Sequence, residues 1–154
     1  MKMSPWAVLV AFLVVVFAVS AVGGLFTASS VGGWYAGLAK PSWRPPNWLF
    51  GPVWTALYAM MAVSAWLVWK RVGFGPALLV FAIQLLINGI WSPVFFGAHS
   101  LGGGLVVIVA LWFGIVGTIA MFWPISLTAA LLLVPYLAWV SFAAVLNFAI
   151  WYLN

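Results

Sequence analysis

The sequence has 154 residues, of which 68% are hydrophobic and only 3% charged, whereas about a quarter of the residues in a water-soluble domain are charged. It contains no Asp, Glu or Cys, which excludes mechanisms that need a carboxylate acid, a carboxylate metal ligand, a thiolate nucleophile or a disulfide. The formal charge of +5 comes from Lys2, Lys40, Arg44, Lys70 and Arg71, which flank apolar runs, and we expect lipid headgroups to hold them there.

Five uncharged apolar runs approach or exceed the roughly 20 residues that a helix needs to cross a bilayer. The predicted spans are 6–26, 48–69, 77–96, 104–123 and 125–153. The runs do not alternate as barrel strands do, so we predict an all-α integral membrane protein with its termini on opposite sides. The chain 1–154 is expected to form a single five-helix domain, and the first run is too long for the apolar part of a signal peptide.

The first connection, 27–46, is too long for a simple turn. It carries Trp34, Tyr35 and Trp43 among glycines and prolines, and a long loop with so many aromatic residues should fold onto the rest of the protein. We predict that it covers the mouth of the bundle as a lid. The alternative is an interfacial segment held in an aromatic belt.

The third span has one face of polar and aromatic residues. Gln84, Asn88, Trp91, Ser92 and Phe95 recur at three- and four-residue steps, so they share a side of the helix, which we predict faces inward. Amides in hydrocarbon need hydrogen-bond partners, which neighbouring helices or a ligand could provide. The pattern leaves both alternatives open.

The second and fifth spans offer further aromatic faces. Trp54 and Tyr58 lie four residues apart, and Pro135 is placed to bend the fifth span. The stripe on the fifth span consists of Trp139, Ala143, Asn147 and Ile150. Together the three faces describe an aromatic pocket for a flat, largely apolar ligand, and ordinary helix packing is the alternative interpretation.

Two smaller features have structural interpretations. Ala110, Gly114 and Thr118 lie at four-residue intervals and allow another helix to approach closely, either within the bundle or in a dimer. His99 lies in a short loop, where we expect a solvated side chain and no metal site, because a lone His lacks the partners that metal ligands usually have.

Several motifs then occur in a characteristic order. The segment 34–46 reads W-Y-A-G-L-A-K-P-S-W-R-P-P, and it is followed by W-T-A-L-Y at 54–58, N-G-I-W-S-P-V-F-F-G at 88–97, P-Y-L-A-W at 135–139 and L-N at 146–147. This series resembles the translocator protein family, also called tryptophan-rich sensory proteins or peripheral-type benzodiazepine receptors, whose first loop reads W-Y and then K-P-x-W-x-P-P.

The resemblance implies a five-helix bundle whose pocket, closed by the first loop, binds protoporphyrin IX or haem and ligands of the benzodiazepine and isoquinoline types. It implies a homodimer in the lipid membrane, no catalytic residue, no obligatory cofactor and no nucleic-acid partner. Carried over motif by motif, the ligand-binding residues are Tyr35, Pro45, Trp54, Tyr58, Asn88, Trp91, Ser92, Phe95, Trp139, Ala143 and Leu146.

The chain also departs from that family. Members often have an acidic residue in the first loop, where this chain has Ala36, Gly37 and Ala39. Animal members have a sterol pattern with a tyrosine followed by a basic residue, but here Phe148 stands in that region with no Lys or Arg after it. We therefore expect a bacterial membrane and no cholesterol transport.

The leading functional hypothesis is tetrapyrrole binding and sensing, with Lys40 or Arg44 pairing with propionate carboxylates. A second is transport of porphyrins or other amphiphiles with the loop as a gate, passive or partner-driven because no carboxylate can couple protons. A third is light- or oxygen-dependent breakdown of porphyrin, and a plain scaffold role is the simplest alternative.

Overall fold

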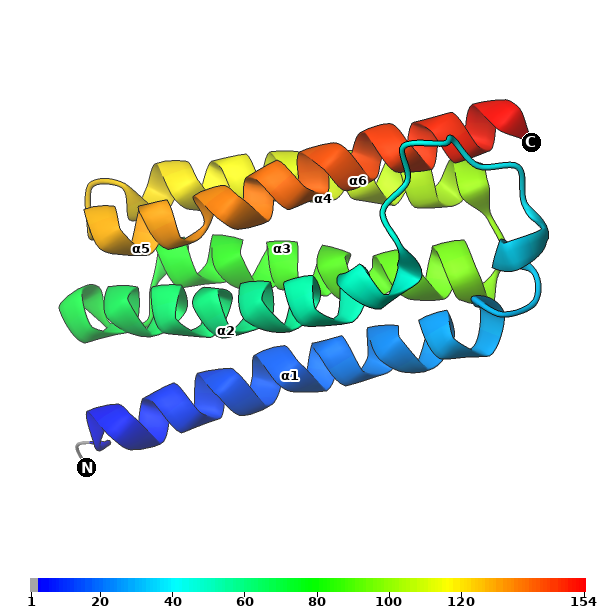
Figure 1. Cartoon of the computed structure of the whole chain (residues 1–154). Coiled ribbons are helices and arrows are strands. Elements are labelled where there is room, and N and C mark those ends of the chain that lie inside the picture. Colours follow the sequence, from blue (N-terminus) through cyan, green and yellow to red (C-terminus); the bar gives the residue numbers. More distant parts are fainter. Residues whose placement is uncertain (1–2) are drawn as a thin grey trace.

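A computed structural model describes residues 3–154, and Lys2, one of the expected headgroup anchors, lies outside them. Within this range the chain has no strand and forms five helical segments long and apolar enough to cross a membrane, which confirms the predicted fold class (Figure 1). The helices are α1 (Pro5–Ser30), α2 (Asn47–Val72), α3 (Pro76–Ser92), α4 (Leu101–Phe122), α5 (Leu127–Leu132) and α6 (Val134–Leu153). The first residues of α1 and the last of α6 lie at opposite ends of the bundle (Figure 1).

Local chemistry explains where the helices begin and end. Pro76 occupies the first turn of α3. Backbone N–H groups in a first turn have no acceptor within the helix, so a proline, which has no N–H, loses no hydrogen bond there. Ser100 and Ser126 cap α4 and α5, because each side chain accepts a hydrogen bond from the backbone N–H three residues on. After α2 the chain turns at Gly73, whose φ of 67° favours glycine.

Two spans are interrupted at prolines. The fifth span breaks at Leu133 between α5 and α6, two residues before Pro135, which confirms that this proline disturbs the helix. The third span continues from α3 into a π-helical turn, Pro93–Gly97, whose first residue has no N–H to donate. This wider turn carries Phe95 and Phe96 into the bundle interior, where both are buried.

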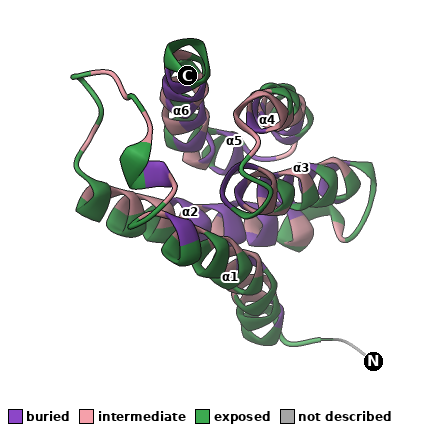
Figure 2. Cartoon of the chain, turned by 90° about the vertical axis from the view of Figure 1, so that its right-hand side faces the viewer, coloured by how far each residue is buried: buried purple, intermediate pink, exposed green. Residues whose placement is uncertain are grey.

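The helices pack around a common core. Helix α1 packs against α2 and α3, α3 against α4, and α4 against α6, while α5 fills the space beside α2. Figure 2 shows buried residues where the helices face one another, whereas α1 is mostly exposed. Because α2 packs closely against α5 and not against α6, the two long helices α2 and α6 meet mainly through aromatic side chains.

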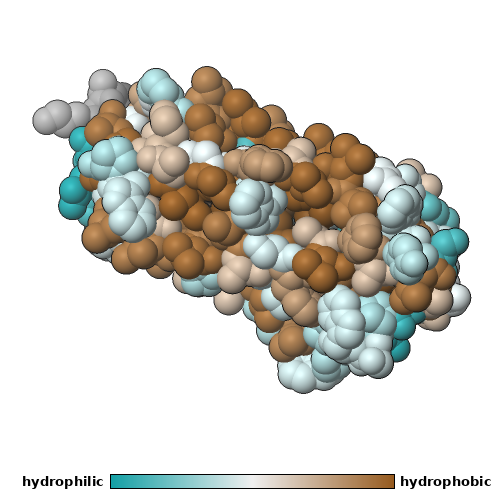
Figure 3. All heavy atoms as spheres, turned by 90° about the horizontal axis from the view of Figure 1, so that it is seen from above, coloured by the Kyte–Doolittle hydropathy of each residue, from teal (hydrophilic) through white to brown (hydrophobic). Residues whose placement is uncertain are grey.

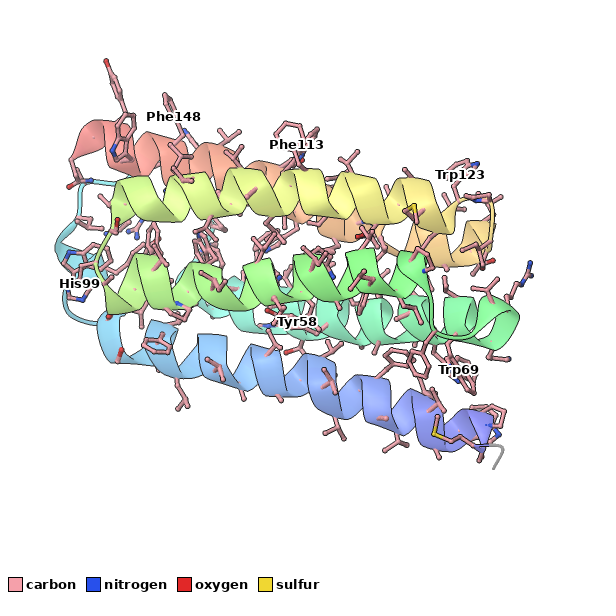
Figure 4. All side chains as sticks on the ribbon, turned by 180° about the vertical axis from the view of Figure 1, so that it is seen from behind. Tyr58, Trp69, His99, Phe113, Trp123 and Phe148 are labelled. Atoms are coloured by element: carbon pink, nitrogen blue, oxygen red, sulfur yellow. The ribbon has the colours of Figure 1, made fainter. Side chains whose placement is uncertain are left out.

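The outside of the bundle matches a hydrocarbon solvent. A hydrophobic band covers its long side and hydrophilic atoms collect towards the two ends (Figure 3). Phe113, Trp123 and Phe148 point away from the helices and are about half exposed or more (Figure 4). Large apolar side chains in such positions would be unfavourable in water and are suited to contact lipid.

Two of the three small residues at four-residue intervals in α4, Gly114 and Thr118, serve packing within the bundle. A Cβ on Gly114 would lie 3.1 Å from the Cβ of Gln84 in α3, so this glycine lets the two helices approach. Thr118 is fully buried and its hydroxyl donates to the Gly114 carbonyl, while Ala110 is exposed. Homodimer formation remains a prediction.

Candidate functional site

A cavity of about 290 Å³ lies inside the bundle, at the end covered by the first loop. It is lined by most of the residues that the sequence singled out, namely Tyr35, Trp54, Tyr58, Asn88, Trp91, Ser92, Phe95, Ala143 and Leu146. They come from the loop, α2, α3, the π-helical turn and α6. Asn147 and Ile150, also in the predicted stripe of the fifth span, line the cavity as well.

Trp139 and Pro45 do not line this cavity. The indole of Trp139 lies in an outer layer, with its ring centre 5.5 Å from Phe50 and 6.5 Å from Trp54, and both of those residues line the cavity. Its Nε1 is buried without a hydrogen-bond partner among the described residues. Pro45 is half-buried within the loop. Helical spacing placed Trp139 on the side of α6 that faces the cavity, but it could not show how far the indole lies from the cavity. Phe50 and Trp54 fill the layer between them.

The first loop covers the mouth of the cavity, as predicted for a lid, and we call residues 31–46 the cap. Tyr35 begins a short 3₁₀ helix, is 6% exposed and packs its ring 5.5 Å from that of Phe96. Burial raises the pKa of the Tyr35 phenol, an effect that the charge of Arg44 partly offsets, so this group is neutral at physiological pH. Trp34 stacks on the imidazole of His99 with ring centres 4.3 Å apart.

Two sets of hydrogen bonds fix the cap. The Lys40 ammonium donates to the carbonyls of Tyr35, Ala36 and Leu38 at 2.7, 3.3 and 2.9 Å, which engages all three of its N–H groups. At the end of α6, the Asn154 side chain accepts from the Ala39 N–H at 3.1 Å and donates to the Ala39 carbonyl at 2.9 Å. Lys40 is therefore a clasp within the loop, and it is not free to pair with a ligand carboxylate while the cap keeps this form.

Replacing Lys40 with methionine should loosen the cap and leave the bundle intact. We expect amide hydrogen exchange across residues 34–46 to speed up about tenfold, corresponding to about 1.4 kcal/mol of local stability, because three carbonyls lose their donor. Arg44→Met is the matched control, since it removes an exposed cation of the same loop. Equal exchange in both variants would show that Lys40 does not hold the cap.

A chain of buried hydrogen bonds forms the floor of the cavity. The Tyr58 hydroxyl donates to Asn88 Oδ1 at 2.6 Å, Asn88 Nδ2 donates to the Tyr136 hydroxyl at 2.7 Å, and that hydroxyl donates to Gln84 Oε1 at 2.8 Å. Tyr58 lies between the helices in Figure 4, and all four residues are buried. The predicted amides of span three thus bond across to α2 and α6, and Asn88 also faces the cavity.

A methionine defines the direction of this chain. Gln84 Nε2 lies 4.0 Å from Met61 Sδ, and a thioether can only accept a hydrogen bond. The Gln84 carbonyl oxygen must therefore face Tyr136, whose own oxygen is then left to accept from Asn88. It follows that Tyr58 gives its proton to Asn88 and presents oxygen lone pairs at the cavity floor.

Helix α1 contributes a wall that the sequence analysis missed. Ser92 and Thr27 both donate to the Gly23 carbonyl at 2.9 Å, and their hydroxyls also lie 2.9 Å apart. Ser20 and Gly24 line the cavity beside them. The available signal was the three- and four-residue spacing of Ser20, Gly23, Gly24 and Thr27, the small and polar positions of an otherwise apolar span.

The aromatic wall opposite is held firmly. Trp91 stacks on Phe95 with ring centres 5.0 Å apart, and its indole N–H donates to Asn147 Oδ1 at 3.1 Å. Asn147 in turn donates to the Leu101 carbonyl at 3.0 Å, which ties α6 to the start of α4. The site therefore offers preorganised aromatic faces with few polar atoms still available, an arrangement for noncovalent binding of an apolar ring system.

Comparison with known proteins identifies the family. The sequence model of the TspO/MBR family matches residues 11–153. The chain belongs to the TspO/MBR family. This confirms the resemblance seen in the loop and span motifs, and with the five apolar helices it makes the chain an integral, multi-pass membrane protein.

Named relatives cover most of the TspO/MBR chain. It is 49% identical over 141 residues to the tryptophan-rich protein TspO of Chlorobaculum tepidum, covering 89% of each chain. It is 39% identical over 152 residues to the human translocator protein, covering 96% of this chain and 90% of that one. The tryptophan-rich sensory protein of Cereibacter sphaeroides is 38% identical over 149 residues, covering 97% and 92%. Since these relatives include bacterial and human proteins, a bacterial membrane remains a prediction.

Proposed function

We propose that this TspO/MBR protein is a membrane sensor that binds a flat, largely apolar tetrapyrrole such as protoporphyrin IX in the capped cavity. The observation that carries the proposal is the capped aromatic cavity itself, with Trp54, Trp91 and Phe95 in its wall and Tyr58 and Asn88 in its floor. Aromatic faces stack on a macrocycle, and a few polar atoms orient it. The name of the Cereibacter relative, a tryptophan-rich sensory protein, supports a sensing role.

The size of the cavity bears on the class of ligand. A volume of about 290 Å³ is near the lower limit of small-molecule sites and suits compact ligands of the benzodiazepine or isoquinoline type. A tetrapyrrole is larger, so Trp54 has to shift or the rim of the macrocycle has to project from the cavity. Because Lys40 is engaged within the cap, the exposed Arg44 is the better partner for a propionate carboxylate.

Binding is better supported than transport by the shape of the site. The cavity ends at the hydrogen-bonded floor of Tyr58 and Asn88, and Tyr136 and Gln84 close the bundle beyond it. A transporter would need this floor to open, which requires breaking several buried hydrogen bonds. A sensor needs only that occupancy changes the packing of the walls.

Replacing Trp54 tests the proposal. In detergent, protoporphyrin IX should shift its absorbance and quench tryptophan fluorescence saturably, and Trp54→Leu should weaken the affinity about tenfold, or about 1.4 kcal/mol. Trp123→Leu is the matched control, because this lipid-facing tryptophan is 54% exposed and lies outside the cavity. Equal affinity in wild type and Trp54→Leu would contradict the proposed site.

The same titration separates binding from porphyrin breakdown. A sensor should give an absorbance that stays constant under illumination in air once binding is complete. Progressive loss of the porphyrin spectrum, slowed in Trp54→Leu but not in Trp123→Leu, would instead favour the photo-oxidative alternative.

A further inference from the structure

The cavity has one exposed side, which lies between α1 and α2. Every cavity-lining residue that is exposed belongs to these two helices: Gly24 in α1, and Asn47, Gly51 and Thr55 in α2. The lining residues of the cap, α3, the π-helical turn, α4 and α6 are buried or half-buried. The cavity is therefore closed towards its other neighbours and opens through a slot, which we define by Gly24, Asn47, Gly51 and Thr55.

The edges of the slot are free of obstruction. A Cβ added at Gly24 or at Gly51 would meet no atom of the described residues within 4 Å. The Thr55 hydroxyl donates to the Gly51 carbonyl of its own helix at 2.8 Å, so its hydrogen is already engaged. An apolar ring can pass such an edge without breaking a hydrogen bond.

The slot also faces the hydrocarbon of the bilayer. Helix α1 is the most apolar of the five spans, and most of its surface is exposed, as Figure 2 shows. The flanks of α1 beside the slot therefore contact lipid. A ligand dissolved in the hydrocarbon would reach the slot without crossing an aqueous boundary.

The end of the bundle offers no comparable route. The cap is fastened by the Lys40 clasp, by the two Asn154–Ala39 hydrogen bonds, by the stacking of Trp34 on His99 and by burial of Tyr35. Entry from water would require most of these contacts to break together.

We propose that ligands enter and leave this site sideways from the bilayer, through the slot between α1 and α2, while the cap stays in place. The inference rests on the proposed function, because it presupposes that the cavity holds a ligand. It restricts that ligand to compounds that partition into membranes and can present an apolar edge first. A polar side group then trails at the lipid headgroups and does not have to enter the cavity.

Two kinds of variant test the route. Gly24→Leu and Gly51→Leu place bulky side chains at the slot, at positions where an added Cβ has open space, and Ala21→Leu, on an exposed position of α1 outside the cavity lining, is the matched control. Ala39→Cys/Asn154→Cys, joined by a short bis-thiol linker, locks the cap, and the absence of natural Cys makes the labelling specific.

The readout is stopped-flow mixing of protoporphyrin IX with each protein in lipid nanodiscs. We expect the slot variants to release bound protoporphyrin IX about tenfold more slowly than the wild type, whereas Ala21→Leu and the locked cap release it at the wild-type rate. Loss of exchange on locking the cap, or unchanged rates in the slot variants, would overturn the proposed route. Absence of saturable binding to the wild type would instead refute the proposed function.

Discussion

Asn88→Leu is expected to unfold more easily than the wild type by about 2–4 kcal/mol and to lose tetrapyrrole binding. Asn88 joins Tyr58 of α2 to Tyr136 of α6, with hydrogen bonds of 2.6 and 2.7 Å. Leucine fits the volume but leaves the Tyr58 hydroxyl without an acceptor and the Tyr136 oxygen without a donor. Both residues are buried, so each orphaned group costs the free energy of removing it from water without a hydrogen bond in return.

Unfolding of Asn88→Leu can be measured by titrating SDS into mixed micelles and following tryptophan fluorescence. The control is the double variant Asn88→Leu/Tyr58→Phe, which removes one of the orphaned hydroxyls and should recover about 1 kcal/mol. If the double variant were less stable than Asn88→Leu alone, unsatisfied polar groups would not be the cause.

Gly104→Ala is expected to cost about 1–3 kcal/mol of stability and to disturb the site. A Cβ at this position of α4 would lie 2.9 Å from Cδ2 of Phe95 and 3.1 Å from Oδ1 of Asn147. Phe95 is 2% exposed and wedged among other rings, so it cannot move aside. Displacing Asn147 would also release the indole of Trp91 from its hydrogen bond.

Gly117→Ala, in the same helix, separates this packing effect from the general effect of removing a glycine. Its Cβ would lie 3.9 Å from the Val80 side chain, an ordinary contact, so we expect unchanged or slightly raised stability. Thermal unfolding in detergent should therefore lower the midpoint for Gly104→Ala alone. Similar midpoints for the two variants would refute the packing argument.

The sequence predicted the spans well because lipid imposes a strong constraint on helix length. The ends were less well predicted: α1 continues to Ser30, four residues beyond its predicted end, since a helix can continue through small residues such as Ala28 and Ser29 after the strongly apolar run has ended. Pro135 was expected only to bend the fifth span, and the structure goes further, with a break between α5 and α6 at Leu133, because proline removes a backbone donor and clashes with the preceding turn.

The site was predicted where residues project from one helix at regular spacing, as Asn88, Trp91 and Ser92 do. Depth could not be read in this way, and Trp139 consequently lies one layer behind its expected place. Nor could the sequence show that three loop carbonyls converge on Lys40. The slot escaped notice because it is formed by missing side chains, at Gly24 and Gly51, and not by present ones.

The fastening of the cap has a consequence for acid conditions. Lids held by ion pairs loosen when their carboxylates are protonated, but the Lys40 clasp uses backbone carbonyls and the sequence has no Asp or Glu. The cap should therefore stay closed in an acidified compartment.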